Sequence, residues 1–379
     1  MRILIVTDIY SPARNGVAIW NALTVRELRA RGHEVQVLTY RHSRRGEGDP
    51  AVTGIHEIAA PLVLDPDFRI GPVWGRLPAS VRGAHWDIIH VHHPLFIGPA
   101  AARFARRSGA RLVFTCHMVY TDYLDEYLWG LARPLKPWLT AAVRRFADGC
   151  DAVLVPASSV VRWMREIGVR ARVEILEAPA DTRRIERVPR AEARAALGLG
   201  DRPVALYVGR IADEKRVQEL VHEFTAAMPE ASPALLALGG TGHRTGAVRH
   251  EVEHCAVPGC VRILGALDAD DLSLWYSAAD VFVSASRAET GPLTLVEAMS
   301  CACPSVSYDA SGFEDRVTDG VNGLLAQDRP GALGAAIHSV LGDPGLRARL
   351  AAGALAASQG HTPAAATDRL LSVYESLLA

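Results

Sequence analysis

Short apolar runs alternate with longer amphipathic segments along the whole chain. In the first half the runs are RILIVTD, EVQVLTY, DIIHVHH, ARLVFTCH and AVLVPAS, and in the second half they are PVALYVG, PALLALGG, VRILGAL, VFVSAS and CPSVSYD. The segments between them show helical spacing, for example NALTVRELRARG and the stretches near 98–108 and 131–147. Such regular alternation predicts parallel β-sheets that are covered by helices on both faces.

The number of expected strands is too large for one Rossmann-like unit. The stretch ADTRRIERVPRAEARAALGLGDRP, residues 180–203, is polar and rich in arginine, has no strand pattern and lies midway. We therefore predict an α/β protein with two Rossmann-like domains whose parallel sheets face a cleft. The predicted parts are residues 1–182, a linker at 183–202, residues 203–361, and a C-terminal helix at 362–379 that packs back toward the N-terminal domain. Open sheets of this kind bind ligands beyond the carboxyl ends of their strands, so residues in those places are the functional candidates.

The composition is typical of a soluble globular protein, with 49% hydrophobic and 22% charged residues. No run of about 18 uncharged apolar residues predicts a transmembrane helix, and the apolar start MRILIVTDIY is too short for a secretory signal. The six cysteines lack Cys-x-x-Cys spacing and are expected to be reduced. We therefore expect a cytoplasmic protein without a nucleic-acid partner.

The net charge of −1 hides an uneven distribution. Residues 1–190 carry 27 basic and 19 acidic side chains, whereas residues 191–379 carry 14 and 23. Only two of the 41 basic residues are lysines, Lys136 and Lys215. A basic half and an acidic half are expected to contact different ligands.

Several residues follow expected strands in the first half. Asn15-Gly16-Val17 opens a helix after the first strand, where a glycine lets backbone approach a ligand, although a plain Asn-Gly turn explains it as well. His92, His93 and His117 follow two further strands. No carboxylate or cysteine joins them at ligand spacing, which argues against a metal site. His92 and His93 read as ordinary strand-end histidines, and His117 remains a candidate.

In the second half, YVGRIADEK places Arg210 and Lys215 after the first expected strand. A fork-shaped guanidinium together with an ammonium suits a diphosphate, and a solvated charged loop is the alternative. LALGGTGH places Gly239, Gly240 and Gly242 after the next strand. This is not a true G-x-G-x-x-G fingerprint, which disfavours a dinucleotide-dependent dehydrogenase.

The stretch AETGPLTLVEAMSCACP sets Glu289 before an expected helix and Glu297 about one turn inside it. A carboxylate before the helix can accept hydrogen bonds from sugar hydroxyls, while the first helical amides, around Leu293 and Thr294, favour a phosphate. A carboxylate within the helix can reach the vicinal hydroxyls of a ribose. The spacing therefore predicts a site that holds two ends of a nucleotide sugar.

Taken together, these motifs resemble the retaining glycosyltransferases of family 4, which have the two-domain GT-B fold. The likeness runs nearly the full length, through NGVA and LRARGHEVQVLT, TCHMVYTDY, YVGRIADEK, AETGPLTLVEAMSCACP and DGVNGLL. Any one of these segments is weak evidence, but the Glu-x7-Glu element combined with the Arg/Lys loop is specific. The nearest branch is that of the enzymes similar to glycosyl-diacylglycerol synthases.

The resemblance implies roles for the strand-end residues. Glu289 would hold the hydroxyls of the donor sugar and Glu297 the ribose. Arg210 and Lys215 would bind the diphosphate and stabilise it as a leaving group, and His117 would contact the sugar near the reacting centre.

The remaining residues of the implied donor site act mainly through their backbone. Gly16 would approach the donor phosphate or the acceptor, the backbone of Leu267 would line the base pocket, and glycines after the second strand would border the nucleotide. The complete additional set is Gly16, Gly239, Gly240, Leu267, Gly291, Leu293 and Thr294.

Three positions depart from the family pattern. Gly291-Pro292 stands where Phe-Gly is common, and Pro292 has no N–H to offer a ligand. Pro179-Ala180-Asp181 replaces a longer Pro-Asn-Gly-Val-Asp segment, and Ala302 stands where a glycine is common. These departures bear on the geometry of the sugar site more than on the fold.

The implied reaction transfers a hexose from a UDP- or GDP-sugar to an acceptor hydroxyl with retention of configuration. The donor is a substrate, and neither a cofactor nor a metal is expected, because arginine and lysine supply the positive charge. The leaving phosphate would help to deprotonate the acceptor, since no carboxylate stands out as a covalent nucleophile. A nucleotide-sugar epimerase and a non-catalytic nucleotide-sugar sensor are the alternatives.

Two classes of acceptor fit the sequence. The motifs HMVYTDY and NGVA look most like the branch that glycosylates diacylglycerol-type lipids, and the basic first half suits an anionic membrane surface. The stretch LARPLKPWLTAAVRRF predicts an interfacial helix at the inner face of the membrane, with apolar and basic residues at Leu131, Leu135, Trp138, Leu139, Lys136, Arg144 and Arg145. The same spacing also fits a helix packed on a core, and a small soluble natural product or cyclitol remains an equal alternative as acceptor.

Overall fold

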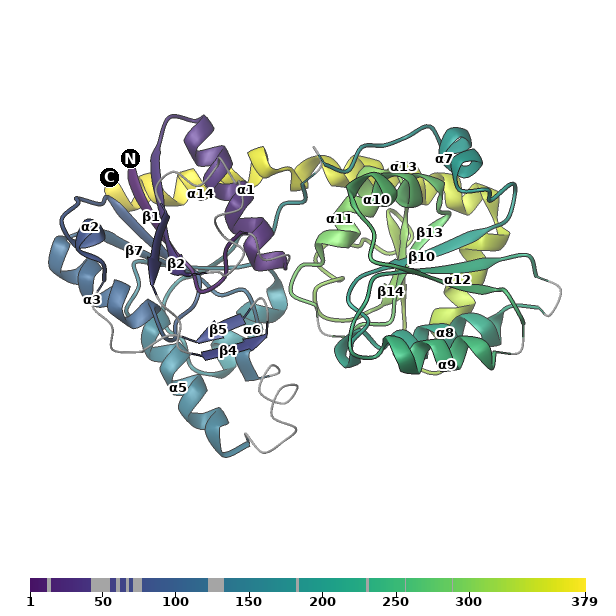
Figure 1. The fold of residues 1–379 in the computed structure, drawn as a ribbon, viewed down its shortest axis with the longest axis horizontal. Coiled ribbons are helices and arrows are strands. Elements are labelled where there is room, and N and C mark those ends of the chain that lie inside the picture. The colour runs from purple at the N-terminus through teal and green to yellow at the C-terminus, as the bar shows by residue number, and fades with distance from the viewer. Residues whose placement is uncertain are drawn as a thin grey trace. The chain divides into compact units, whose positions relative to one another are not determined.

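The computed structural model describes residues 1–11, 15–41, 55–58, 62–65, 68–70, 77–121, 133–181, 184–229, 232–255, 257–287 and 289–379. These residues form two compact units (Figure 1). The first unit comprises Met1–Pro179 and Pro363–Ala379, and the second comprises Ala180–Thr362. Each unit has its own parallel sheet with helices packed against it, which confirms the α/β class that the alternating pattern predicts.

The chain enters the sheet of the first unit at an interior strand, β1. Its strand order is β3-β2-β1-β6-β7-β8-β9, and the pairings between neighbours are parallel. The chain starts at β1, winds outward to β3, and then returns to the other side of β1 at β6. The strands are β1 (Arg2–Val6), β2 (Glu34–Tyr40), β3 (Ile55–Ile58), β6 (Ile88–Val91), β7 (Arg111–Thr115), β8 (Ala152–Val155) and β9 (Val173–Ile175).

Helices bury the apolar faces of this sheet. Ile3, Leu4, Ile5 and Val6 of β1 have no exposed surface, and burial of each such side chain contributes roughly 1.5–3 kcal/mol. A separate antiparallel pair is formed by β4 (Leu62–Asp65) and β5 (Phe68–Ile70). The helical elements are α1 (Gly16–Ala30), α2 (Ala79–Arg82), α3 (Gly98–Ser108), η1 (Arg133–Leu135), α5 (Lys136–Ala147), α6 (Ser158–Glu166) and α14 (Pro363–Leu378).

The C-terminal helix α14 belongs to the first unit and packs beside α1 (Figure 1). Arg31 at the end of α1 forms an ion pair with Asp368, with 2.8 Å between Nη2 and Oδ1. Deeper in the unit, the hydroxyl of Tyr374 lies 2.6 Å from Nδ1 of His90, in the middle of β6. The last helix is therefore attached to the sheet through a buried hydrogen bond as well as through its apolar face.

The sheet of the second unit repeats the winding of the first. Its order is β12-β11-β10-β13-β14-β15, again with parallel pairings. The chain enters at β10 in the middle and crosses back to its other side at β13. The strands are β10 (Val204–Val208), β11 (Leu235–Gly239), β12 (Val261–Gly265), β13 (Val281–Ser284), β14 (Ser305–Tyr308) and β15 (Gly323–Ala326).

The segment that we predicted as a linker packs onto the second unit instead. Ile185, Ala193 and Leu199 are buried in its core, and α7 lies against α10. The predicted linker is rich in arginine, so these few apolar positions gave no recognisable pattern in the sequence. The helical elements of this unit are α7 (Arg190–Ala196), η2 (Asp213–Lys215), α8 (Val217–Ala227), α9 (Thr245–Glu253), α10 (Ala269–Ala278), α11 (Leu293–Ser300), α12 (Ala332–Gly342), α13 (Pro344–Ser358) and η3 (Gln359–His361).

The strands that the sequence pattern missed are short. They are β3, β4, β5, β9 and β15, each of three or four residues. Such strands carry too few positions to show a period of two. In the described part of the chain, no helix combines the length and apolarity needed to cross a membrane.

Helix α11 ends in a turn that holds Ala302 in the left-handed region, with φ of +58°. The amide of Ala302 donates to the carbonyl of Met299, and the amide of Cys303 donates to that of Ala298. This pattern is a Schellman motif, in which glycine normally occupies the left-handed position. The absence of the family's usual glycine at position 302 therefore leaves a strained backbone.

We expect Ala302→Gly to stabilise the second unit by about 1 kcal/mol, because glycine adopts this conformation without a clash of its side chain. Thermal unfolding should shift upward by roughly 2–4 °C. The control is Ala335→Gly, the same change at an exposed position inside α12, which should destabilise by about 1 kcal/mol. Equal destabilisation by both variants would contradict the assignment of strain to position 302.

Candidate active site

The predicted diphosphate and sugar residues meet at the point where the strand order of the second sheet reverses. Strands β10 and β13 are neighbours there although three helices and two strands separate them in the chain. Arg210 and Lys215 follow β10, and Glu289 follows β13. A ligand site is expected beyond the carboxyl ends at such a reversal.

Lys215 and Glu289 form a close ion pair. The ammonium nitrogen of Lys215 lies 2.7 Å from Oε1 of Glu289, and the side chains are 21% and 11% exposed. Arg210 pairs with Glu214 at 2.7 Å between Nη2 and Oε1, and its backbone carbonyl accepts a hydrogen bond from the hydroxyl of Tyr207. The structure therefore brings Lys215 and Glu289 into contact and holds Arg210 on the same loop as Lys215.

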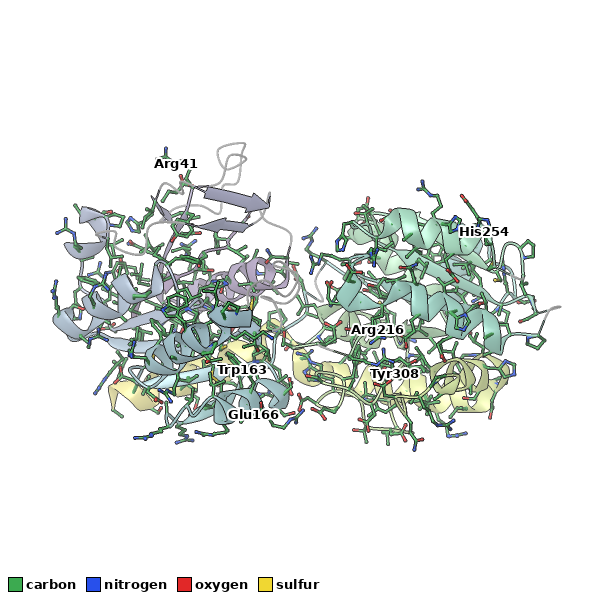
Figure 2. All side chains as sticks on the ribbon, turned by 90° about the horizontal axis from the view of Figure 1, so that it is seen from below. Arg41, Trp163, Glu166, Arg216, His254 and Tyr308 are labelled. Carbon is green, nitrogen blue, oxygen red and sulfur yellow. The ribbon has the colours of Figure 1, made fainter. Side chains whose placement is uncertain are left out.

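The loop that carries Glu289 is fixed from two sides. The amide of Glu289 donates to the carbonyl of Ser311. A side chain on Gly312 would collide with the backbone of Glu289, because its Cβ would lie 2.2 Å from the carbonyl oxygen of Glu289. Two residues earlier, Arg287 donates to Glu219 on α8 and lies over the ring of Tyr308. Tyr308 also donates to Glu219, at 3.0 Å. Figure 2 labels Tyr308 among the side chains of the second unit. These contacts preorganise the carboxylate of Glu289.

Helix α11 begins immediately after this loop. Gly291 has φ of +118°, and Pro292 occupies the N-cap position without a side-chain hydrogen bond to the helix. The first amides, those of Leu293 and Thr294, therefore lack an intrahelical or capping partner among the described residues. Such amides and the positive end of the helix dipole attract a phosphate.

Glu297 lies further along α11 and is partly buried. Its Oε2 accepts a hydrogen bond from the hydroxyl of Tyr276 at 3.0 Å. Burial raises the pKa of Glu297, while the bond from Tyr276 partly offsets this effect. The structure does not join Glu297 to the Lys215–Glu289 pair, so the two glutamates have different surroundings.

The glycines after β10 and β11 allow two loops to touch. A side chain on Gly240, where φ is +131°, would lie 1.8 Å from the carbonyl oxygen of Gly209. A side chain on Gly239 would lie 2.7 Å from Cδ1 of Leu267. Gly240 therefore needs to be glycine for the packing of backbone on backbone, whereas Gly239 packs directly against the side chain of Leu267.

In the first unit, the carboxyl ends of β1, β6 and β7 carry a buried polar group of residues. Asn15 caps α1 by accepting from the amide of Ala18, so that Gly16 opens the helix. The amide of Asp8, at the end of β1, donates to Nδ1 of His93 at 3.4 Å. Oδ1 of Asp8 is buried and has no hydrogen-bond partner among the described residues, and burial raises the pKa of this carboxyl well above its usual range.

Four buried histidines surround this edge. Nδ1 of His92 lies 2.7 Å from Nε2 of His117, and both nitrogens of His90 are bonded, to Tyr374 and Thr115. Burial lowers the pKa of His90 to about 3 and that of His93 to about 4. The pKa values of His92 and His117 also fall well below the usual value, mainly through burial. These rings are therefore neutral near pH 7. His92 and His93 follow β6 directly, as expected, and they are buried beside His117.

Sequence reasoning missed several contributors to these sites. Asp8, Tyr276, Ser311 and Gly312 carried no motif of their own, although the Ser-Gly pair after an expected strand is a turn signal. It also missed one group that could hold a metal ion, which is exposed at the end of α9 and formed by His250, Glu253 and His254. Their ligand atoms lie within 4.8 Å of one another.

Comparison with known families decides the identity of the fold. Residues 14–184 match the family model described as Glycosyltransferase Family 4, and residues 189–356 match that described as Glycosyl transferases group 1. A D-inositol 3-phosphate glycosyltransferase from Xylanimonas cellulosilytica is 30% identical over 92% of this chain and 88% of its own length. The chain belongs to the family 4 glycosyltransferases.

Further relatives of this glycosyltransferase agree with that assignment. The alpha-monoglucosyldiacylglycerol synthase of Acholeplasma laidlawii is 26% identical over 86% of this chain and 84% of its own length. The solved structure of HepE from Anabaena in complex with UDP matches with a TM-score of 0.80 and 18% identity, over 99% of this chain and 100% of that protein. The GT-B fold and the membership of family 4, both expected from the motifs, are confirmed, and a glycosyl-diacylglycerol synthase is among the relatives.

The buried histidines predict a loss of stability in acid. The unfolded chain protonates them near pH 6.5, whereas the buried rings stay neutral, so the unfolded state binds more protons. The stability that the neutral rings contribute is therefore fully present above pH 6.5. It is lost as the pH falls toward the folded-state pKa values of about 3 for His90 and about 4 for His93. Asp8 opposes this effect, because burial raises its pKa and the folded state then holds its proton to a higher pH than the unfolded chain does.

Urea unfolding of the first unit at pH 7, 6 and 5 should show the free energy of unfolding falling below pH 6, by up to about 1.4 kcal/mol per pH unit for each proton that the unfolded chain binds in excess. His93→Gln should reduce this slope by about one proton. His338→Gln, a change at an exposed position on α12, should leave it unchanged. A slope in His93→Gln equal to that of the unaltered protein would contradict the prediction.

Proposed function

We propose that this glycosyltransferase moves a hexose from a nucleoside diphosphate sugar, linked to UDP or GDP, to an acceptor hydroxyl with retention of configuration. The observation that carries the proposal is the contact between Lys215 and Glu289 beside the open amide end of α11. One ligand with a diphosphate next to a hydroxylated ring would satisfy all three groups. A nucleotide sugar has this arrangement.

The positive charge for the leaving diphosphate comes from the chain itself in this proposal. The ammonium of Lys215 would exchange its bond to Glu289 for the diphosphate, and Arg210 would add a second cation from the same loop. The amides of Leu293 and Thr294 would donate to the phosphate oxygens. Preorganised donors of this kind stabilise charge that develops in the transition state, so the reaction would need no divalent metal.

The two glutamates would bind opposite ends of the donor. Glu289, released from Lys215, would accept hydrogen bonds from the hydroxyls of the sugar. Glu297, held by Tyr276, would accept from the hydroxyls of the ribose. Gly239, Gly240 and the backbone of Leu267 would border the base.

Retention would follow from attack on the same face that the diphosphate leaves. The leaving phosphate would accept the proton of the acceptor hydroxyl, and positioning of the two substrates would supply much of the rate. His117 would contact the sugar near the reacting carbon, and Gly16 would let the first turn of α1 approach the substrates.

The acceptor that we favour is a diacylglycerol-type lipid reached from an anionic membrane surface. Leu135 and Trp138 at the start of α5 are 49% and 66% exposed, beside the basic Lys136. Arg144 and Arg145, further along α5, are also exposed, whereas Leu139, which we had placed on the same face, is buried in the core. Leu131 lies outside the described residues. An exposed tryptophan with flanking cations suits the interface of a membrane.

A small soluble polyol is the second candidate, because a relative that is 30% identical is named as a D-inositol 3-phosphate glycosyltransferase. The experiment that tests the function crosses UDP- and GDP-hexoses with diacylglycerol vesicles and with inositol phosphate, without metal and with chelator present. NMR of the product should show the anomeric configuration of the donor. Epimerised donor without any acceptor would support an epimerase, and binding without transfer would support a sensor.

The glutamates should separate by function. Glu297→Gln should weaken binding of UDP or GDP about tenfold or more, because a ribose contact is worth roughly 1.5–3 kcal/mol when a charged acceptor is lost. Glu289→Gln should leave the affinity for the free nucleotide nearly unchanged while slowing transfer. Titration calorimetry with the free nucleotide, followed by turnover assays, distinguishes the two, and the reverse pattern would overturn the assignment.

Trp138→Ala should reduce sedimentation with anionic vesicles roughly tenfold or more, since burial of such a side chain is worth about 1.5–3 kcal/mol. Leu378→Ala is the matched control, because Leu378 is also an exposed apolar residue on a helix of the first unit, at 44%. Transfer to a soluble acceptor should persist in both variants. If the unaltered protein ignores vesicles and glycosylates only the soluble acceptor, the lipid assignment is wrong while the transferase assignment stands.

A further inference from the structure

His92 and His117 share a short hydrogen bond in the interior of the first unit. Their Nδ1 and Nε2 atoms are 2.7 Å apart, and the rings are 1% and 5% exposed. Both rings are neutral near pH 7, as argued above, so one nitrogen of the pair carries the shared proton and the other accepts it. The position of that proton decides which atom of His117 can donate to a substrate.

The two possible arrangements leave different atoms unpaired. If His117 donates, Nδ1 of His92 accepts and Nε2 must carry the single N–H proton of the neutral His92 ring, although this buried nitrogen has no partner among the described residues. If His92 donates from Nδ1, its Nε2 is an unprotonated acceptor. Buried N–H donors without a partner are rarer than unpaired acceptors. A buried donor that makes no hydrogen bond costs about 1–3 kcal/mol.

The neighbouring ring already holds one such donor. Nδ1 of His93 accepts the amide proton of Asp8, so neutral His93 carries its own proton on Nε2, which is also buried without a described partner. A second unpaired N–H on His92 would add to this cost. The arrangement in which His92 donates avoids it.

We propose that His92 is a positioning residue, whose Nδ1–H donates to Nε2 of His117 and so keeps His117 in the tautomer that carries its proton on Nδ1. His117 then offers a hydrogen-bond donor on the side of its ring away from His92. This inference rests on the proposed function for its consequence, because a donor at Nδ1 can bind a hydroxyl oxygen of the sugar, whereas the other tautomer can only accept there.

Further contacts fix the plane of the His117 ring. The indole of Trp20, on α1, meets it edge to face, with centroids 4.7 Å apart at 87°. The ring of His92 lies nearly parallel to it, at 18° and 5.0 Å. His92 also contacts His90, with 4.3 Å between the ring centroids. Both nitrogens of His90 are hydrogen-bonded. An orientation held by an outer hydrogen bond is how proteins commonly set the tautomer of a functional histidine.

The direct test is nitrogen NMR of the intact protein labelled with ¹⁵N-histidine. We expect His117 to show a protonated Nδ1 and an unprotonated Nε2, and His92 to show a protonated Nδ1. Replacing His92 by leucine should remove this single tautomer at His117. The control is His90→Leu, which breaks buried hydrogen bonds on the same strand without touching the His92–His117 bond, and should lower stability while leaving the tautomer of His117 intact.

Turnover gives a second readout. His92→Leu should lower kcat roughly 10–100-fold, the usual effect of removing an outer partner of a functional histidine, with the KM for the donor within about threefold. His92→Asn should restore most of kcat, because the amide nitrogen of asparagine occupies nearly the place of Nδ1 and can donate to His117.

The outcomes separate this inference from the proposed function. A wild-type spectrum with the proton on Nε2 of His117 overturns the inference whatever the enzyme transfers. Equal loss of kcat in His92→Leu and His92→Asn also overturns it. If the spectrum is as expected but no donor is turned over, the tautomer assignment stands and the transferase proposal fails.

Discussion

The winding of each sheet from its middle strand is the constraint on which the candidate sites depend. Because parallel strands need crossover helices on the faces of the sheet, all strand ends of one kind lie at one edge. The chain then places β1 beside β6, and β10 beside β13, although each pair is distant in sequence. The loops after these central strands must diverge to opposite faces, and open α/β sheets in general bind ligands at such a divergence.

The two units use this shared geometry in opposite electrostatic ways. The second unit collects charge, with the ammonium of Lys215 against the carboxylate of Glu289 and helix amides beside them. The first unit collects groups whose charged forms are disfavoured, because burial keeps the histidines unprotonated near pH 7 and raises the pKa of Asp8. A charged edge suits a diphosphate and a neutral edge suits hydroxyl groups, which agrees with the roles that we propose for Lys215 and His117.

Both edges depend on contacts made away from the reacting groups. Ser311, Gly312 and the Arg287–Glu219 pair hold the loop of Glu289, and Tyr276 holds Glu297. In the first unit, Tyr374 of the C-terminal helix reaches His90 in the centre of the sheet, next to His92. The last helix of the chain therefore supports the histidine cluster, since the hydroxyl of Tyr374 bonds to His90, whose ring packs against that of His92.

The sequence by itself determined the α/β class, the two-unit organisation and the strand-end positions of Arg210, Lys215 and Glu289. Local patterns sufficed because buried strands read as apolar runs and because sites at strand ends follow them directly in the chain. Short strands such as β9, and the packing of Ala193 and Leu199 within an arginine-rich segment, gave no local signal. The tertiary structure alone decided which partners those residues meet: Lys215 with Glu289, Tyr276 with Glu297, and His92 with His117. Each of these contacts joins residues at least 21 positions apart, and the folded backbone brings them together through packing that no local spacing encodes.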